Sequence, residues 1–139
     1  ELADTVTVEV LPGPQLPNVQ ANPRLLRRAI GNLIDNAIRS AKARVAVRLT
    51  HDGRQILIDV EDDGPGVPIA ERARILEPFQ RIDVERRRGP AGCGLGLAIV
   101  RRIAAHHQGG IAVGDSQLGG ARFRFTLPLS QSEDQTASA

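Results

Sequence analysis

The stretch Arg44–Glu61, RVAVRLT-HDGR-QILIDVE, decides the fold class. It consists of two expected strands, Arg44–Thr50 and Gln55–Glu61, separated by the four residues His51–Arg54. The Asp52-Gly53 pair within that gap favours a tight hairpin turn. Adjacent hairpins argue against an all-parallel doubly wound sheet, so the sequence predicts an α+β sandwich with helices on one face.

Further strands are expected on both sides of this hairpin. Thr5–Val10 alternates apolar and polar residues, which is typical of a half-buried strand. Asn18–Ala21 is a candidate short strand after a turn rich in proline. Near the end, Ile111–Gly114 and Ala121–Leu129 are expected strands joined by a Gly119-Gly120 turn.

Three helices are expected. The first runs from Pro23 to Ala41, with Asn22 as its N-cap and Pro23 at its first position. The second is a short helix over Pro68–Leu76, and the third covers Leu95–His107. In the first helix, helical spacing predicts an apolar face made of Leu26, Ile30, Leu33, Ile34, Ala37 and Ala41, and an opposite polar face made of Arg28, Asn32, Asp35, Asn36 and Arg39.

Composition indicates one ordinary globular domain. The 139 residues are 41% hydrophobic and 24% charged, so we expect a single domain over residues 1–130 and a disordered polar tail over 131–139. Cys93 is the only cysteine, which excludes an intrachain disulfide. No apolar run is long enough to cross a bilayer and no signal peptide is evident. Because the chain begins at Glu1 rather than Met, we expect an excised fragment of a larger protein.

Arginine dominates the basic residues, since Lys42 is the single lysine and the formal net charge is only +2. The planar arginine fork suits phosphate recognition. A genome-wide preference for Arg codons would explain the same composition. The net charge alone does not argue for nucleic-acid binding.

A glycine-rich run, Gly92-Cys93-Gly94-Leu95-Gly96-Leu97, ends a basic loop and opens a helix. Glycines let backbone N–H groups approach an anion, and the helix N-terminus adds a favourable dipole. Tight turns use the same pattern. The run is not a Walker A loop, because no Gly-Lys-Ser/Thr follows and no strand immediately precedes it.

Asp62-Asp63-Gly64-Pro65-Gly66 follows a predicted strand, and a simple turn explains its glycines and proline. It explains Asp62 less well, because Asp63 already supplies a turn carboxylate. An Asp at a strand end could accept a hydrogen bond from the exocyclic amine of a base such as adenine.

Asn32 and Asn36 lie one helical turn apart, followed by Arg39. Amide oxygens can complete the coordination of Mg²⁺ that is already bound to phosphate, and the Arg39 guanidinium could pair with phosphate oxygens. A solvated polar helix face is the simpler interpretation of these three residues taken alone.

The order and spacing of these motifs resemble the ATP-binding family shared by gyrase, certain chaperones, mismatch-repair ATPases and sensor histidine kinases. Asn32–Ala37 is similar to the N box of the kinases, and Asp62–Gly66 to the G1 box. Glu77-Pro78-Phe79 resembles the F box, Gly92–Leu97 the G2 box, and Gly119-Gly120 a G3-like turn. The likeness extends to about Leu129, and its spacing is most similar to two-component kinases of the osmosensor and magnesium-sensor type.

The resemblance implies a Bergerat-type sandwich with a flexible ATP lid, and ATP and Mg²⁺ as ligands. It implies that Asn36 binds the metal, with Asn32 near the phosphates, and that Asp62, Gly64 and Gly66 form the base pocket. Asn36, Arg39 and Arg81 are the candidate catalytic residues. The lid and the G2 box would supply the remaining nucleotide contacts, from Arg81, the Arg86–Arg88 run with Arg88, Gly92, Gly94, Leu95, Gly96 and Leu97.

The resemblance also implies a protein histidine kinase whose phosphoacceptor lies elsewhere. None of His51, His106 and His107 has the sequence context of a phosphoacceptor, so we expect structural or solvent-facing roles for them. The expected partners are a histidine-bearing dimerisation domain of the same parent and a downstream response regulator, with no nucleic acid. We expect a monomeric fragment, outside the membrane, from the cytoplasmic side of an inner-membrane sensor.

One residue departs from the family pattern. Ser40 stands where the family usually has an aromatic residue that packs on adenine, and losing that contact would weaken binding by about 1 kcal/mol. Two alternatives remain open from the sequence: an anti-sigma-type serine kinase or non-catalytic nucleotide module with the same pocket, and a module that binds nucleic acid or an acidic partner through its arginines alone. The latter would be strongly salt-sensitive and indifferent to Asp62.

Overall fold

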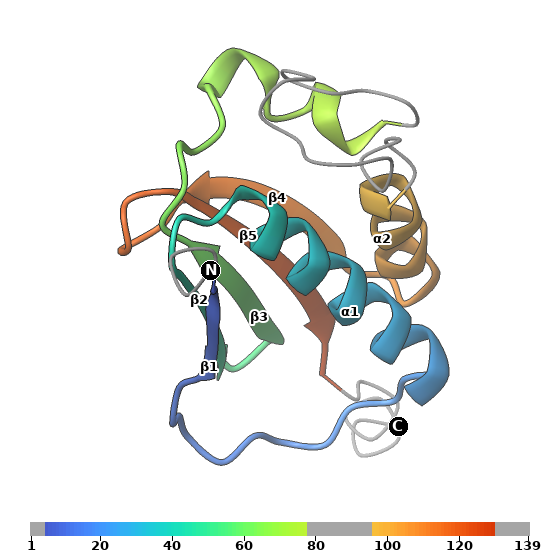
Figure 1. Ribbon diagram of the computed structural model, residues 1–139. Helices are drawn as coiled ribbons and strands as arrows, with labels where there is room; N and C mark the ends of the chain where they lie inside the picture. Colours follow the sequence, from blue (N-terminus) through green and yellow to red (C-terminus); the bar gives the residue numbers. More distant parts are fainter. Residues whose placement is uncertain (1–4, 78–95, 130–139) are drawn as a thin grey trace, which may run out of the picture.

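The computed structural model describes residues 5–77 and 96–129, and its strands in these ranges form one five-stranded sheet (Figure 1). The order across the sheet is β1-β2-β3-β5-β4. β1 pairs in parallel with β2, and the other neighbours are antiparallel. The strands are β1 Thr7–Val10, β2 Arg44–His51, β3 Gln55–Asp62, β4 Gly110–Asp115 and β5 Ala121–Pro128. The sheet is therefore mixed and mostly antiparallel, which confirms the expectation that it is not all-parallel.

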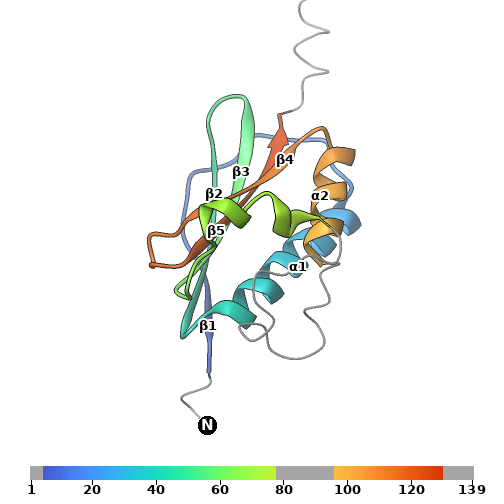
Figure 2. The same cartoon turned by 90° about the horizontal axis from the view of Figure 1, so that it is seen from above.

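Two α-helices, α1 (Pro23–Ser40) and α2 (Gly96–His106), cover one face of the sheet, as the edge-on view in Figure 2 shows. α1 begins as predicted, because the Asn22 side chain accepts hydrogen bonds from the N–H groups of Arg24 and Leu25 at 3.0 and 3.1 Å. The two helices run antiparallel. Asn22 at the start of α1 contacts His107 just after α2, and Asn32 contacts Gly96 at the start of α2.

The predicted short helix over residues 68–76 is two 3₁₀ turns, η2 (Ile69–Glu71) and η3 (Arg74–Leu76). A segment this short gains too few α-helical hydrogen bonds to offset helix nucleation. It forms i→i+3 bonds instead, such as that from the Glu71 N–H to the Pro68 carbonyl at 2.9 Å. Leu76 is buried and fixes the segment against the core.

Asn18–Ala21 forms no strand in the described structure, which corrects the prediction. After β1, the Leu11 N–H still donates to the Val47 carbonyl at 2.8 Å. Three prolines then follow within six residues, at positions 12, 14 and 17. Because proline has no N–H to donate, the chain leaves the sheet edge here and reaches α1 in an extended path.

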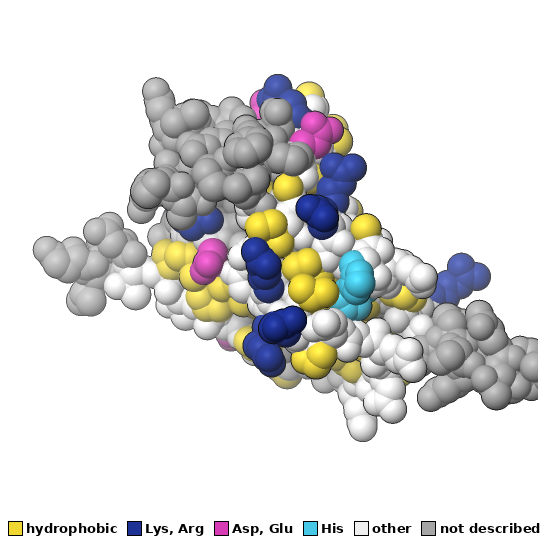
Figure 3. Space-filling view, turned by 90° about the vertical axis from the view of Figure 1, so that its right-hand side faces the viewer, with side chains coloured by type: hydrophobic (Ala, Val, Ile, Leu, Met, Phe, Trp, Pro, Cys, Tyr) yellow, Lys and Arg dark blue, Asp and Glu magenta, His cyan; other side chains and the backbone are white. Residues whose placement is uncertain are grey.

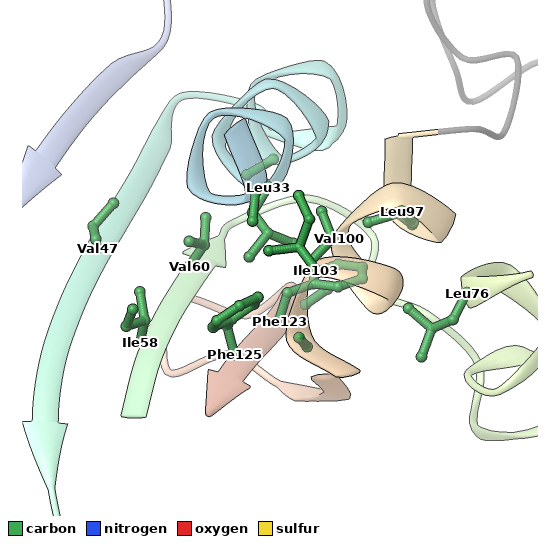
Figure 4. Packing of buried hydrophobic residues seen from close by; sticks show 14 of the residues in the cluster. Leu33, Val47, Ile58, Val60, Leu76, Leu97, Val100, Ile103, Phe123 and Phe125 are labelled. Carbon is green, nitrogen blue, oxygen red and sulfur yellow. The ribbon is translucent and has the colours of Figure 1, made fainter. Parts of the chain in front are cut away.

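The core lies between the helices and the inner face of the sheet. Figure 4 shows Leu33 of α1 beside Val100 and Ile103 of α2, above Phe123 and Phe125 of β5. β5 alternates buried and half-buried residues along its whole length, as a strand with one covered face should. None of the described helices has the length and hydropathy needed to cross a bilayer.

Candidate functional site

α1 places its polar residues differently from the predicted two-faced arrangement. Asn36 is only 4% exposed and lies in the buried arc with Ala29, Leu33 and Ala37. The prediction that Asn36 lies on a solvated face is therefore wrong. The physical reason is that α1 packs against α2 as well as against the sheet, so its buried arc is wider than one apolar stripe.

Asn32 joins α1 to the beginning of α2. Its Nδ2 donates to the carbonyl of Gly96 at 3.4 Å, across 64 residues of sequence. Leu97 is buried and anchors this end of α2 in the core. A Cβ added to Gly96 would meet no atom of the described residues within 4 Å. The structure therefore brings the N-box Asn32 together with the end of the Gly92–Leu97 motif.

Asp62 is the last residue of β3 and is 1% exposed. Its Oδ1 accepts hydrogen bonds from the N–H groups of Gly64 and Ala121, at 2.8 and 3.2 Å. Its Oδ2 is buried and has no hydrogen-bond partner in the described structure. A buried carboxylate oxygen without a partner is rare in native proteins and is suited to a hydrogen-bond donor on a ligand.

Burial raises the pKa of Asp62, and the hydrogen bonds from Gly64 and Ala121 oppose this rise without cancelling it. The neighbouring Asp63 carboxylate adds to the rise. No cation forms an ion pair with Asp62 within the described residues. Such a perturbed acid in a buried position is characteristic of a binding site.

Three glycines let backbone segments close around Asp62. A Cβ on Gly64 would collide with the carbonyl of Ser40, and a Cβ on Gly120 would collide with Asp62 itself. Gly66 has a φ of +80°, in the region that favours glycine. The Gly120 N–H also donates to the Asp62 carbonyl at 3.1 Å. The end of α1, the Asp62–Gly66 turn and the Gly119-Gly120 turn therefore meet at one place.

Asp63 points away from this site and holds the loop between α1 and β2. Its carboxylate accepts from the N–H groups of Lys42 at 2.8 Å and Ala43 at 3.1 Å. Desolvation raises the pKa of Asp63, but hydrogen bonds from Ala43, Arg44 and Lys42 outweigh it and hold the pKa below its ordinary value. Asp63 is thus a structural carboxylate.

Arg39 lies in the last turn of α1, and its Nε is buried without a hydrogen-bond partner in the described structure. The Nε of Arg39 and the Oδ2 of Asp62 are therefore two buried polar atoms near the C-terminal end of α1 that have no hydrogen-bond partner in the described structure. Among the described residues, no group of three His, Cys, Asp or Glu side chains could hold a metal ion. A cation here would need amide oxygens and oxygens from a ligand.

Several predicted site residues lie outside the described residues. They belong to the F box, the lid and most of the G2 box: Phe79, Arg81, the Arg86–Arg88 run with Arg88, Gly92, Gly94 and Leu95. Sequence reasoning also missed two backbone contributors, the Ala121 N–H and the Ser40 carbonyl. No side-chain pattern marks a backbone group, and only the glycines at 64 and 120 indicated a close approach.

His107 has the structural role that was predicted for it. Its Nε2 accepts a hydrogen bond from the N–H of Asn22 at 3.0 Å, and its Nδ1 lies 2.9 Å from the Ile103 carbonyl. His51 and His106 are exposed.

The chain is similar to a family of ATPases and to bacterial sensor proteins. A family described as histidine kinase-, DNA gyrase B- and HSP90-like ATPase matches residues 21–131. The sensor protein RstB of Escherichia coli is 45% identical over 116 residues, 84% of this chain and 27% of RstB. The sensor histidine kinase CpxA of Escherichia coli is 40% identical over 129 residues, 93% of this chain and 28% of CpxA. The chain therefore spans just over a quarter of the length of these relatives.

Among solved structures, full-length ShkA in complex with AMPPNP superposes with a TM-score of 0.76. It is 33% identical to this chain, and the match covers 90% of this chain and 26% of ShkA. The similarity confirms the predicted Bergerat-type sandwich.

Proposed function

Because this chain belongs to the family of histidine kinase-, DNA gyrase B- and HSP90-like ATPases, we propose that it binds ATP with Mg²⁺ between α1, the Asp62–Gly66 turn and the start of α2. The observation that carries the proposal is the buried Oδ2 of Asp62, which has no partner in the described structure. An adenine amino group would supply the missing donor, and guanine, which has a carbonyl at that position, would not.

The neighbouring residues support a nucleotide rather than a free base. Arg39, with its unused Nε, is a cation placed one turn after Asn36 and would pair with phosphate oxygens. The backbone of Gly96 lies at the N-terminus of α2, where phosphate is favoured. Arg81, Arg88, Gly92, Gly94 and Leu95 are proposed as further phosphate contacts.

The amide oxygen of Asn36 is the proposed protein ligand of Mg²⁺, with Asn32 beside the phosphates. The hard amide oxygen and the lack of an acidic cluster among the described residues suit a cation that arrives with the nucleotide. When bound, Mg²⁺ would neutralise charge on the triphosphate. Asn32 is already oriented towards α2 by its hydrogen bond to Gly96.

In the parent protein, we propose that this domain donates the γ-phosphoryl group to a histidine on a separate dimerisation domain. The histidine nitrogen would form a bond to the γ-phosphorus as the bond to the β-phosphate oxygen breaks, releasing ADP. Arg39 and Arg81 would stabilise the charge that develops on the phosphates. RstB and CpxA are named as sensors, which supports a sensory role for the parent protein. As part of this proposal, a response regulator acts downstream, and this domain, residues 1–130, lies on the cytoplasmic side of the membrane.

Calorimetric titration with a non-hydrolysable ATP analogue, with and without Mg²⁺, tests the pocket. Asp62→Asn should weaken binding about ten- to a hundredfold, because it replaces a charged acceptor. Asn36→Ala should remove most of the Mg²⁺ dependence. Asp63→Asn is the matched control, since this adjacent carboxylate faces the α1–β2 loop, and it should leave affinity within a factor of about two.

The GTP analogue should bind far more weakly than the ATP analogue. Absence of binding to the unmodified chain, or equal losses for Asp62→Asn and Asp63→Asn, would contradict the proposed pocket. Normal autophosphorylation by an Asn36→Ala variant of the full-length parent would contradict the proposed kinase role.

A further inference from the structure

The outer surface of the helix pair carries a groove that the proposed nucleotide site does not use. It has a volume of about 340 Å³ and is called the α1–α2 groove below. Figure 3 shows this side of the molecule, with basic side chains distributed around apolar ones. The groove is lined by Leu25, Arg28, Ile99, Arg102, Ile103 and His106.

The groove and the proposed nucleotide contacts involve different residues of the two helices. Its residues come from the first two turns of α1 and run along α2 from Ile99 in its first turn to His106, its last residue. At this end the helices are tied by the hydrogen bond between Asn22 and His107. The other end, where Asn32 meets Gly96, belongs to the nucleotide site. None of the residues that line the groove is a proposed nucleotide contact.

The floor of the groove is apolar and incompletely covered. Ile103 is buried, whereas Leu25 and Ile99 are only half-buried although they pack on the core. These side chains lie between two antiparallel helices, so they form a strip rather than a closed pocket. Such a strip matches a third helix that places its own apolar side chains into it.

Arg28 and Arg102 line the groove, and the helices that carry it have a basic surface. Five arginines on α1 and α2 are exposed, and the two helices contain a single acidic residue, Asp35. Neither Arg28 nor Arg102 has an ion-pair partner within the described ranges. On the sheet side, by contrast, Arg48 and Arg124 are paired with carboxylates. The exposed arginines are Arg24, Arg27, Arg28, Arg101 and Arg102.

We propose that the α1–α2 groove docks an acidic amphipathic helix of a partner protein. The apolar stripe of that helix would cover Leu25, Ile99 and Ile103. Its flanking Glu and Asp side chains would pair with Arg28 on one rim and Arg102 on the other, which are the cations left unpaired here. The charge selects the partner and the apolar strip supplies affinity.

The test uses this chain and a synthetic helical peptide with Leu at helical spacing and Glu on both flanks. A second peptide carries Lys in place of every Glu. The Glu peptide should bind with shifts of backbone amide NMR signals centred on α1 and α2, and the Lys peptide should not. Arg28→Glu combined with Arg102→Glu should weaken the Glu peptide by at least about tenfold. Higher salt should weaken it too.

The matched control combines Arg44→Glu with Arg54→Glu, which changes the net charge equally at exposed positions on the sheet side. This control should bind the Glu peptide as the unmodified chain does. Both double variants should retain binding of the ATP analogue, which shows that they fold and separates this test from that of the nucleotide site.

Four outcomes would overturn the proposal. The first is equal binding of the Glu and Lys peptides, and the second is an equal loss of Glu-peptide binding in the two double variants. The third is that the chain binds neither peptide but does bind vesicles of anionic lipid or nucleic acid. The fourth is that the chain sediments as a dimer and that Arg28→Glu with Arg102→Glu makes it a monomer.

Discussion

Strand β3 carries three buried acidic residues that lie in two different environments. Asp59 and Glu61 face the outer side of the sheet and are each 3% exposed, whereas Asp62 faces the helices and is 1% exposed. Asp59 receives two hydrogen bonds from Arg124, at 2.7 and 2.9 Å. Asp62 receives only backbone N–H groups, and one of its oxygens has no partner in the described structure.

Glu61 confirms that the outer face is a satisfied network. It accepts from the Ser116 hydroxyl and the Gln117 N–H, both at 3.0 Å, and Arg48 lies 3.6 Å away. The difference within one strand teaches that burial of an acid does not by itself mark a functional site. The mark is a buried acid whose hydrogen bonds are left incomplete, because the fold then bears a desolvation cost that only a ligand relieves.

The largest effect is expected from breaking the outer network. Asp59→Ala should lower the free energy of unfolding by about 3 kcal/mol, because it leaves Arg124 half-buried and without its carboxylate. Urea denaturation measures the change. Adding Arg124→Leu to Asp59→Leu should recover much of the loss, since the pair is then removed together. A loss below about 1 kcal/mol would show that the network is no more than a surface ion pair.

The next effect tests the close approach of the Gly120 turn to Asp62. Gly120→Ala should cost about 2 kcal/mol, because the added Cβ would collide with Asp62 and with the backbone of Gly64. It should also weaken the ATP analogue. Gly31→Ala is the control, since a Cβ there meets no described atom within 4 Å, and alanine in a helix should stabilise by up to about 1 kcal/mol. Both values come from the same denaturation experiment.

Asp62→Asn should increase the stability of the fold and decrease the affinity for the ATP analogue. The raised pKa of Asp62 means that the folded state disfavours the charged form. Its destabilising contribution is therefore absent below the ordinary aspartate pKa of about 4 and grows as pH rises through the folded pKa. At pH 7 the variant should be more stable by up to about 1 kcal/mol while binding the ATP analogue less well. Lower stability at pH 7 would refute this account of Asp62.

Local chemistry explains why much of the fold could be predicted. The Asp52-Gly53 turn and the Asn22 cap depend on neighbours in sequence, and the structure confirms both. β1 forms a strand as predicted, but all four of its residues are exposed, so the half-burial inferred from its alternating residues is wrong. The 3₁₀ turns at residues 69–76 were misassigned, because hydrophobic spacing does not distinguish a short α-helix from two 3₁₀ turns.

The site was less predictable, because its decisive contacts are distant in sequence. The Asp62–Gly64 turn and the Gly119-Gly120 turn were both recognised. The hydrogen bond between Asp62 and Ala121 could not be predicted, because the two residues are 59 positions apart in the sequence. Asn36 was placed in solvent, since the sequence does not show that α2 packs beside α1. Asp62 and Asp63 are adjacent residues of the same type, so the sequence does not show which side chain is buried. The backbone conformation at the end of β3 determines this.

The smallest effect sharpens that last distinction. Asp63→Asn should lower the free energy of unfolding by about 0.5 kcal/mol at pH 7, because asparagine still accepts from Lys42 and Ala43 but without charge. The lowered pKa of Asp63 places its stabilising contribution above the ordinary aspartate pKa of about 4, and it is lost as pH falls through the lower folded pKa. The stabilities of the two proteins should therefore converge in acid, once Asp63 is protonated in the folded state as well. If the two free energies of unfolding instead differed at low pH and became equal at high pH, this account of Asp63 would be wrong.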